Sequence, residues 1–268
     1  MIVTMDYQFL LPEGRGPWQE EPELSPRPQV WGGWATFGFG LLIFFITLIV
    51  QVILGFLIAF IYIMVQESAG VSLDSVNDLI DQFGGVITSI SVIVNGVIGT
   101  GLIWLIIRAK RGLSFTEYLG FRKFRPRTLL LLLATFGLYY GFVVVMNIVT
   151  NQPGEGSSDL ALYSVEVWPV LVWISFVIFA PLYEEIWIRG FLLEGFARSK
   201  IGAVGAIALT SLFWAVQHVQ YSMFQVGMIF VFGIVLGIVR LRTKSLWAPI
   251  SLHIINNLIA MIELTMLN

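Results

Sequence analysis

Ionisable side chains stand inside three strongly apolar stretches of this 268-residue chain. The stretch WPVLVWISFVIFAPLYEEIWIRGFL carries Glu184, Glu185 and Arg189 near its middle, and the two histidines of the chain, His218 and His253, lie in two further apolar stretches. An ionisable group at membrane depth costs roughly 2.5–3.5 kcal/mol on insertion scales, so such groups tend to face a protein interior or a water-filled cavity. Two carboxylates, two imidazoles and a guanidinium in these places favour a buried hydrolytic site.

The spacing within the first stretch predicts which groups meet. Glu185 and Arg189 are four residues apart, so they share one face of a helix and can form an ion pair. Glu184 is rotated by about 100° on the same helix and stays free for other work. A buried ion pair can fix the rotation of the helix and so aim the neighbouring carboxylate.

The third stretch, LWAPISLHIINNLIAMI, holds an imidazole and two carboxamides. His253 and Asn257 are four residues apart and share a helix face, whereas Asn256 is rotated off that face. An imidazole beside a carboxamide can supply a pair of hydrogen-bond donors for an oxyanion.

A hairpin between the first and second stretches would place Glu184 and His218 at one depth. Glu184 lies 17 residues before Ile201 at the turn, and His218 lies 17 residues after it. With straight and continuous α-helices, both side chains would lie about 25 Å from that turn. Antiparallel packing would then bring the carboxylate and the imidazole to the same level.

The composition is that of an integral membrane protein. Hydrophobic residues make up 57% of the chain and charged residues 12%, with a mean hydropathy of +0.85, whereas soluble domains carry about 25% charged residues. The basic residues form no extended stripe, so nucleic acid is not an expected partner, whereas membrane lipid is. The absence of cysteine excludes disulfides, thiolate ligands of zinc and a thiol nucleophile.

Apolar runs predict an all-α bundle of about seven transmembrane helices, six to eight in all, with the site between the last four. The runs lie near residues 35–66, 84–108, 128–150, 168–198, 201–219, 224–240 and 245–265. In the sixth run, Gly233 and Gly237 have the spacing of a close helix-packing face.

The segments between these runs predict the orientation and the domain organisation. Every second connection is rich in Lys and Arg, as the positive-inside rule requires if the N-terminus is cytoplasmic. Residues 1–30 are acidic and proline-rich, and we expect a flexible or extended tail there. Residues 31–268 would form the transmembrane domain.

Each polar group also has a structural interpretation. A lone Glu–Arg pair can clamp a membrane helix, and a single histidine can be a helix–helix contact. Asn256 and Asn257 can hold neighbouring helices together by hydrogen bonds. The joint occurrence of these groups in three apolar stretches favours a functional site over three unrelated structural contacts.

At these residues the sequence resembles the CAAX protease and bacteriocin-processing family of intramembrane peptidases, which includes the Ras-converting CAAX endopeptidase. The resemblance covers roughly residues 168–260, and Trp214 stands where the family often has Phe. It is carried by three motifs in order: Glu184-Glu185-x-x-x-Arg189, Trp214-x-x-x-His218 and His253-x-x-x-Asn257.

The resemblance implies a role for each matched residue. Glu184 would be the general base that activates a water molecule, and His218 would help to hold that water. His253 and Asn257 would stabilise the oxyanion formed when water attacks a peptide carbonyl, and the Glu–Arg pair would support Glu184. The substrate would be a membrane-associated or lipidated peptide, either a prenylated CAAX tail or a bacteriocin-type peptide. No residue of the set is an expected covalent nucleophile, which favours direct hydrolysis.

Alternatives to this interpretation come from two directions. Two histidines and a glutamate are a known catalytic zinc set, although the His-Glu-x-x-His motif is absent. The resemblance instead implies a glutamate-dependent peptidase without a metal or other cofactor. A non-enzymatic scaffold or regulator, or an ion-coupled transporter, could also have a polar core. A transporter would be expected to show inverted repeats, and the sequence has none that we can detect.

Overall fold

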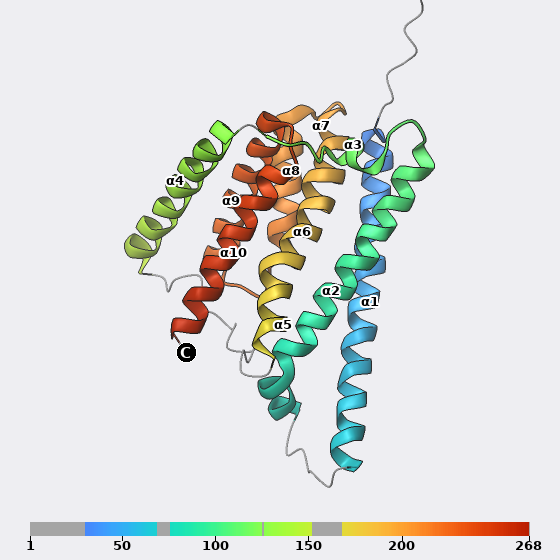
Figure 1. Ribbon diagram of the computed structural model, residues 1–268, viewed down its shortest axis with the longest axis vertical. Coiled ribbons are helices and arrows are strands. Elements are labelled where there is room, and N and C mark those ends of the chain that lie inside the picture. Colours follow the sequence, from blue (N-terminus) through green and yellow to red (C-terminus); the bar gives the residue numbers. More distant parts are fainter. Residues whose placement is uncertain (1–29, 69–75, 125, 152–167, 268) are drawn as a thin grey trace, which may run out of the picture.

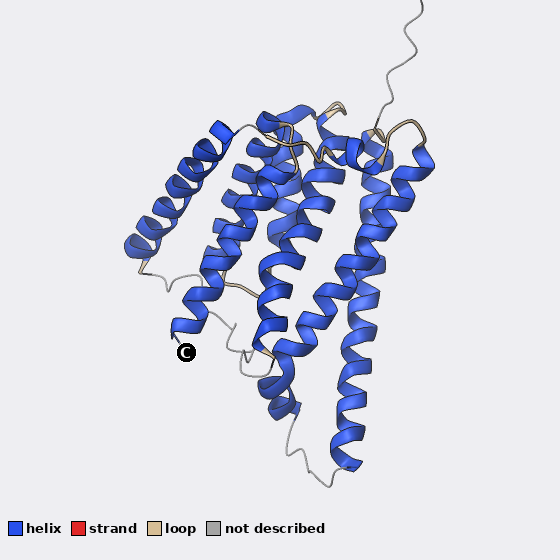
Figure 2. Ribbon diagram, viewed as in Figure 1, coloured by secondary structure: helices blue, strands red, loops and turns tan. Residues whose placement is uncertain are grey.

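The computed structural model describes residues 30–68, 76–124, 126–151 and 168–267, and within these ranges the chain forms helices and turns but no strand (Figure 2). Long helices run side by side from one end of the bundle to the other (Figure 1). The predicted all-α membrane bundle is therefore confirmed. The predicted tail over residues 1–30 lies, apart from Val30, outside the described residues.

Six helical segments among the described residues are long and apolar enough to cross a membrane, as expected of an integral multi-pass protein. They are α1 (Gly33–Ser68), α2 (Val76–Lys110), α4 (Pro126–Thr150), the composite segment Pro169–Ala197, α9 (Met223–Thr243) and α10 (Trp247–Leu267). The seventh predicted helix, near residues 201–219, is the shorter apolar helix α8 (Gly202–Val216).

Helix α8 is too short to cross a bilayer alone. Its 15 residues span about 22 Å at 1.5 Å per residue, against roughly 30 Å for the hydrocarbon core. The chain then turns through residues 217–222 and returns in α9. Irregular backbone at membrane depth is tolerated where it lines a polar cavity or is buried in protein, so this turn is a natural place for a site.

The composite segment Pro169–Ala197 is the most deeply buried of the six spans. It consists of α5 (Pro169–Ile174), the π-helical segment η4 (Ser175–Phe179), α6 (Ala180–Glu184), the π-helical segment η5 (Glu185–Leu192) and α7 (Leu193–Ala197). In η4 the N–H of Ala180 donates to the carbonyl of Ser175, five residues back. The next residue is Pro181, which has no N–H to donate, so the helix is irregular immediately before the Glu-Glu pair.

Two glycines allow α8 and α9 to approach closely, as their spacing predicts. A Cβ at Gly233 would lie 2.9 Å from the Cβ of Ser211, and a Cβ at Gly237 would lie 3.2 Å from the side chain of Ile207. Larger residues at either position would push the two helices apart. The close packing of α8 on α9 fixes the position of the turn that joins them.

A buried arginine holds the basic end of the bundle together. Arg240, only 4% exposed, donates from Nη2 to the carbonyl of Leu119 at 3.0 Å and lies 3.1 Å from Oε2 of Glu194. These contacts join α9 to α7 and to the short helix α3 (Phe115–Leu119). The ends of α2, α7 and α9 that carry the basic connections lie at the same end of the bundle as the start of α1 (Figure 1). The orientation of that end in the membrane stays a prediction.

Helix α3 begins with a capping box at this end. The hydroxyl of Ser114 accepts from the N–H of Glu117 at 3.3 Å, and the Glu117 carboxylate accepts from the N–H of Ser114 at 2.9 Å. Hydrogen bonds from Ser114 hold the pKa of Glu117 below its ordinary value. The box fixes the start of a short helix that closes the basic end of the bundle.

Candidate active site

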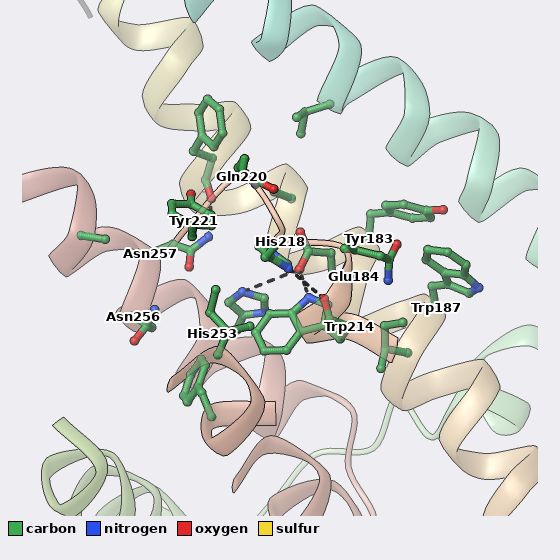
Figure 3. A pocket seen from close by; sticks show the side chains of 18 of the residues that line it. Tyr183, Glu184, Trp187, Trp214, His218, Gln220, Tyr221, His253, Asn256 and Asn257 are labelled. Atoms are coloured by element: carbon green, nitrogen blue, oxygen red, sulfur yellow. Dashed lines mark hydrogen bonds and ion pairs between the residues drawn. The ribbon is translucent and has the colours of Figure 1, made fainter. Parts of the chain in front are cut away.

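The four predicted catalytic residues line one cavity of about 360 Å³. Glu184 comes from the end of α6, His218 from the turn after α8, and His253 and Asn257 from α10. Asn256 lines the cavity as well (Figure 3). Residues from three separate apolar stretches are thus brought together at one place.

Glu184 presents a carboxylate to this cavity. Its side chain is 25% exposed, and its Oε2 accepts a hydrogen bond from Nε1 of Trp214 at 2.5 Å. The same oxygen lies 4.0 Å from Nε2 of His253. In the sequence, Trp214 was noted only as the residue that stands where the family often has Phe. Its indole N–H, four residues before a membrane-embedded histidine, is the feature that could have indicated a polar contact.

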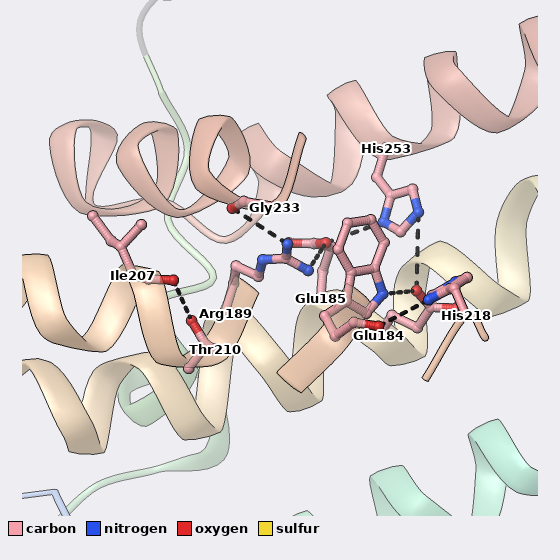
Figure 4. A network of polar contacts seen from close by, with 9 residues as sticks. Glu184, Glu185, Arg189, Ile207, Thr210, His218, Gly233 and His253 are labelled. Atoms are coloured by element: carbon pink, nitrogen blue, oxygen red, sulfur yellow. Dashed lines mark hydrogen bonds and ion pairs between the residues drawn. The ribbon is translucent and has the colours of Figure 1, made fainter. Parts of the chain in front are cut away.

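Behind the cavity wall, Glu185 forms the centre of a buried network (Figure 4). Its Oε1 accepts from Nη1 of Arg189 at 2.9 Å and lies 3.0 Å from Nδ1 of His253. Glu185 is fully buried and Arg189 is 1% exposed, and Nη2 of Arg189 donates to the carbonyl of Gly233 at 3.4 Å. The predicted ion pair is confirmed, whereas its contact with His253 on another helix was not foreseen.

The hydrogen bonds of His253 determine how its ring is used. A carboxylate can only accept, so Nδ1 of His253 carries the hydrogen that faces Glu185. The ring is thereby oriented with Nε2 on the side of Glu184. Edge-to-face contacts with Trp214 and Phe232, at centroid distances of 5.2 and 5.9 Å, hold the ring in this orientation.

Trp214 connects the cavity side of the site to the buried network. The guanidinium of Arg189 lies 4.5 Å from the centre of the Trp214 ring, while the indole nitrogen of the same residue donates to Glu184. One side chain therefore contacts the carboxylate, the guanidinium and the His253 ring. This arrangement makes Trp214 a positioning residue for Glu184.

His218 lies in the turn that follows α8 and not within a helix as predicted. Its Nδ1 is 2.9 Å from the carbonyl of Trp214. Because a carbonyl only accepts, Nδ1 carries the hydrogen, and Nε2 of the neutral ring is then an acceptor. His218 and Glu184 both line the cavity, in agreement with the depth expected from the hairpin.

Asn257 pairs with a main-chain carbonyl that is left without its helical partner in the segment before Glu184. Its Nδ2 donates at 2.9 Å to the carbonyl of Phe176, which lies five residues before Pro181. In the register of η4, that carbonyl would be paired by the N–H of residue 181, which proline lacks. A carboxamide nitrogen has two hydrogens, so Asn257 can make this contact and still offer one donor to the cavity.

No group of three or more histidine, aspartate or glutamate side chains within the described ranges is arranged to hold a metal ion. The two ring nitrogens of His253 face different carboxylates, and Nδ1 of His218 is engaged by a backbone carbonyl. This donor geometry gives the zinc alternative no support of its own. A chelator experiment tests it directly.

Comparison with known proteins gives one match. Residues 166–259 match the family model described as type II CAAX prenyl endopeptidase Rce1-like. The matched segment contains all seven named residues of the three sequence motifs. No curated protein and no solved structure matches the chain.

Proposed function

We propose that this chain, whose residues 166–259 match the Rce1-like family of type II CAAX prenyl endopeptidases, hydrolyses a peptide bond in a membrane-associated substrate with Glu184 as the general base. The proposal rests above all on the setting of the Glu184 carboxylate. It faces a cavity that also contains two imidazoles, and Trp214 holds one of its oxygens. The substrate that we propose is a prenylated CAAX tail or a bacteriocin-type peptide.

The first step is the attack of water on the scissile carbonyl. A water molecule in the cavity donates one hydrogen bond to Glu184 and the other to Nε2 of His218, whose Nδ1 is engaged by Trp214. As the water oxygen forms a bond to the carbonyl carbon, its proton passes to the Glu184 carboxylate. The carbonyl electrons move to oxygen and generate a tetrahedral oxyanion.

The oxyanion needs donors on the opposite side of the carbonyl from the water. Asn257 supplies the amide hydrogen that the Phe176 carbonyl does not use. His253, whose ring Glu185 orients by accepting from Nδ1, supplies an N–H from Nε2 when both ring nitrogens carry a hydrogen. When the tetrahedral species collapses, the C–N bond breaks and the proton on Glu184 passes to the leaving amine. Glu184 is regenerated and a new carboxyl terminus and a new amino terminus are released.

Mass-spectrometric mapping of new peptide termini in host membranes tests this function. Wild type and Glu184→Gln would be compared at matched expression, with Glu263→Gln as a control for the loss of another membrane-embedded carboxylate. Glu263 of α10 accepts a hydrogen bond from the hydroxyl of Tyr140 on α4 and does not line the cavity. We expect termini that are present with wild type and Glu263→Gln and absent with Glu184→Gln.

Two results of this experiment would contradict the proposal. Identical terminus maps from folded wild type and Glu184→Gln would show that the carboxylate is not required, and would favour the scaffold alternative. Loss of the termini on treatment with 1,10-phenanthroline, with recovery on addition of zinc, would replace the metal-free mechanism with a zinc mechanism. Unchanged termini in the presence of the chelator are the expected result.

A further inference from the structure

The cavity extends beyond the helices that carry the motifs. Gln51 of α1 and a row on α2, Thr88, Val92 and Asn95, also line it, although α1 and α2 lie outside the family match. Thr88, Val92 and Asn95 are spaced i, i+4 and i+7, so they lie on one face of α2. Two helices without any of the predicted catalytic residues thus supply one wall of the cavity.

Asn95 is a buried amide with only half of its hydrogen bonding satisfied. The side chain is 8% exposed, and its Nδ2 donates to Oε1 of Gln51 at 3.4 Å. Its Oδ1 has no hydrogen-bond partner in the part of the chain that the structure describes. A buried polar atom without a partner is unfavourable, and more so in a segment that lies within a membrane. Because Asn95 lines the cavity, a molecule bound there can provide the missing donor.

Close packing places Asn95 beside the helix that bears Glu184. A Cβ at Gly96 would lie 3.5 Å from the Cβ of Tyr183, and Tyr183 directly precedes Glu184. Gly99, one turn further along α2, leaves room for the Tyr183 ring, which a Cβ there would meet at 2.3 Å. Figure 3 shows Glu184 between His253 on one side and Tyr183 with Trp187 on the other. Helix α2, which bears Asn95, and helix α10, which bears His253, both pack against α6, which ends at Glu184.

The charge of the cavity wall indicates which ligand fits. Among the described residues that line it there is no lysine or arginine, and Glu184 is the acidic one. A phosphate headgroup would find no lysine or arginine there, whereas a neutral peptide amide would find both donors and acceptors. Seven of the 23 lining side chains are carboxamides: Gln51, Asn95, Gln217, Gln220, Gln225, Asn256 and Asn257.

We propose that Asn95, held by Gln51, is a substrate-binding residue that accepts a hydrogen bond from a main-chain N–H of the peptide beside the scissile bond. This inference rests on the proposed function, because it takes the ligand to be the main chain of a lipidated peptide substrate. Gln51 fixes the rotation of the Asn95 amide, so that Oδ1 and not Nδ2 is presented to the peptide. The contact selects an extended main chain independently of side-chain sequence.

A scan of backbone N-methylation tests the contact directly. The probe is a farnesylated peptide with a CAAX terminus, prepared as a series in which each main-chain N–H except the scissile one is methylated in turn. Hydrolysis would be measured in liposomes with wild type, Asn95→Leu, Gln51→Leu and the control Ser91→Ala. Binding of the same peptides to Glu184→Gln would be measured in parallel. Ser91 is a buried polar residue on α2 that does not line the cavity.

We expect one methylated position to lower kcat/KM about tenfold in wild type and Ser91→Ala, the cost of one lost hydrogen bond. In Asn95→Leu the same methylation should change kcat/KM by less than about twofold, because the acceptor is already gone. Gln51→Leu should give an intermediate effect. It also provides the measurement if Asn95→Leu does not fold, because Gln51 is exposed and its replacement removes no buried group.

The outcomes separate this inference from the proposed function. Hydrolysis that requires Glu184 but shows the same methylation pattern in wild type, Asn95→Leu and Gln51→Leu would overturn the inference and leave the function standing. Hydrolysis that persists in Glu184→Gln would overturn the function. Failure of wild type to cleave the unmethylated peptide, together with failure of Glu184→Gln to bind it, would overturn the inference for a CAAX-type main chain.

Discussion

Replacing Arg189 by methionine should strongly destabilise the protein. The substitution keeps an unbranched side chain of similar length but removes the guanidinium that lies 2.9 Å from Oε1 of Glu185. The Glu185 carboxylate would then be fully buried with His253 as its remaining partner, since its Oε2 already has no hydrogen-bond partner among the described residues. The cation above the Trp214 ring would also be lost.

The magnitude follows from the burial of the pair. Removing one partner of a buried ion pair typically costs about 3–5 kcal/mol, because the other charge is left uncompensated. Arg198 and Glu194 form an ion pair with the same spacing of four residues, but Arg198 is 58% exposed. Arg198→Met should therefore cost less than about 1 kcal/mol. The double variant Glu185→Gln/Arg189→Met removes both buried charges and should regain most of the lost free energy of unfolding.

Reversible unfolding in mixed micelles, followed by tryptophan fluorescence over a titration with sodium dodecyl sulfate, would measure these differences. A free energy of unfolding for Arg189→Met within about 1 kcal/mol of that for Arg198→Met would refute the reasoning, since burial would then make no difference. The double variant should fold and yet hydrolyse substrate poorly. A carboxamide at position 185 is a weaker acceptor for Nδ1 of His253 than a carboxylate is, so it orients the ring less firmly.

Two further substitutions test the positioning of the site. Trp214→Phe keeps an aromatic ring but removes the hydrogen bond to Glu184, so kcat/KM for the mapped substrate should fall about 10–100-fold while the free energy of unfolding changes much less. An unchanged kcat/KM would show that Glu184 needs no such partner. Gly237→Leu should lower the free energy of unfolding by at least about 1–3 kcal/mol, because the added side chain meets Ile207 of α8, whereas Gly227→Leu on the same helix points into open space and should be tolerated. Equal effects of the two leucines would contradict the close packing of α8 on α9.

Hydrophobicity was sufficient to predict the helical architecture. The apolar runs were long enough to identify six spans and the shorter helix α8, and the small residues at 233 and 237 identified a packing face. The π-helical segments were not predicted, because hydrophobic periodicity does not report which carbonyl each N–H reaches. Pro181 was the available local signal, since a proline within a helix forces its neighbours to find other partners.

Within the site, spacing along one helix predicted what lies on one face and nothing beyond it. The Glu185–Arg189 pair was therefore found, whereas the contact of Glu185 with His253 depends on how two helices are rotated about their axes. The hydrogen bond between Trp214 and Glu184 was not predicted for the same reason, because the two residues lie on different helices. Asn95 was missed for another reason: it lies in a helix that was interpreted through its hydrophobicity alone, although an amide in such a helix was itself a signal.

The short helix α8 also constrains how the protein is made. A segment of about 22 Å has too little apolar length to settle across a bilayer while it is the most recently synthesised part of the chain. Helix α8 begins at the basic end of the bundle, and helix α9 ends there (Figure 1). The two helices therefore form a hairpin whose tip need not emerge on the far side of the membrane. Insertion by the translocon would then proceed for the two helices as one unit, and the turn with His218 would reach its place from within the membrane. In this respect the biogenesis of α8 and α9 differs from that of the other five long spans.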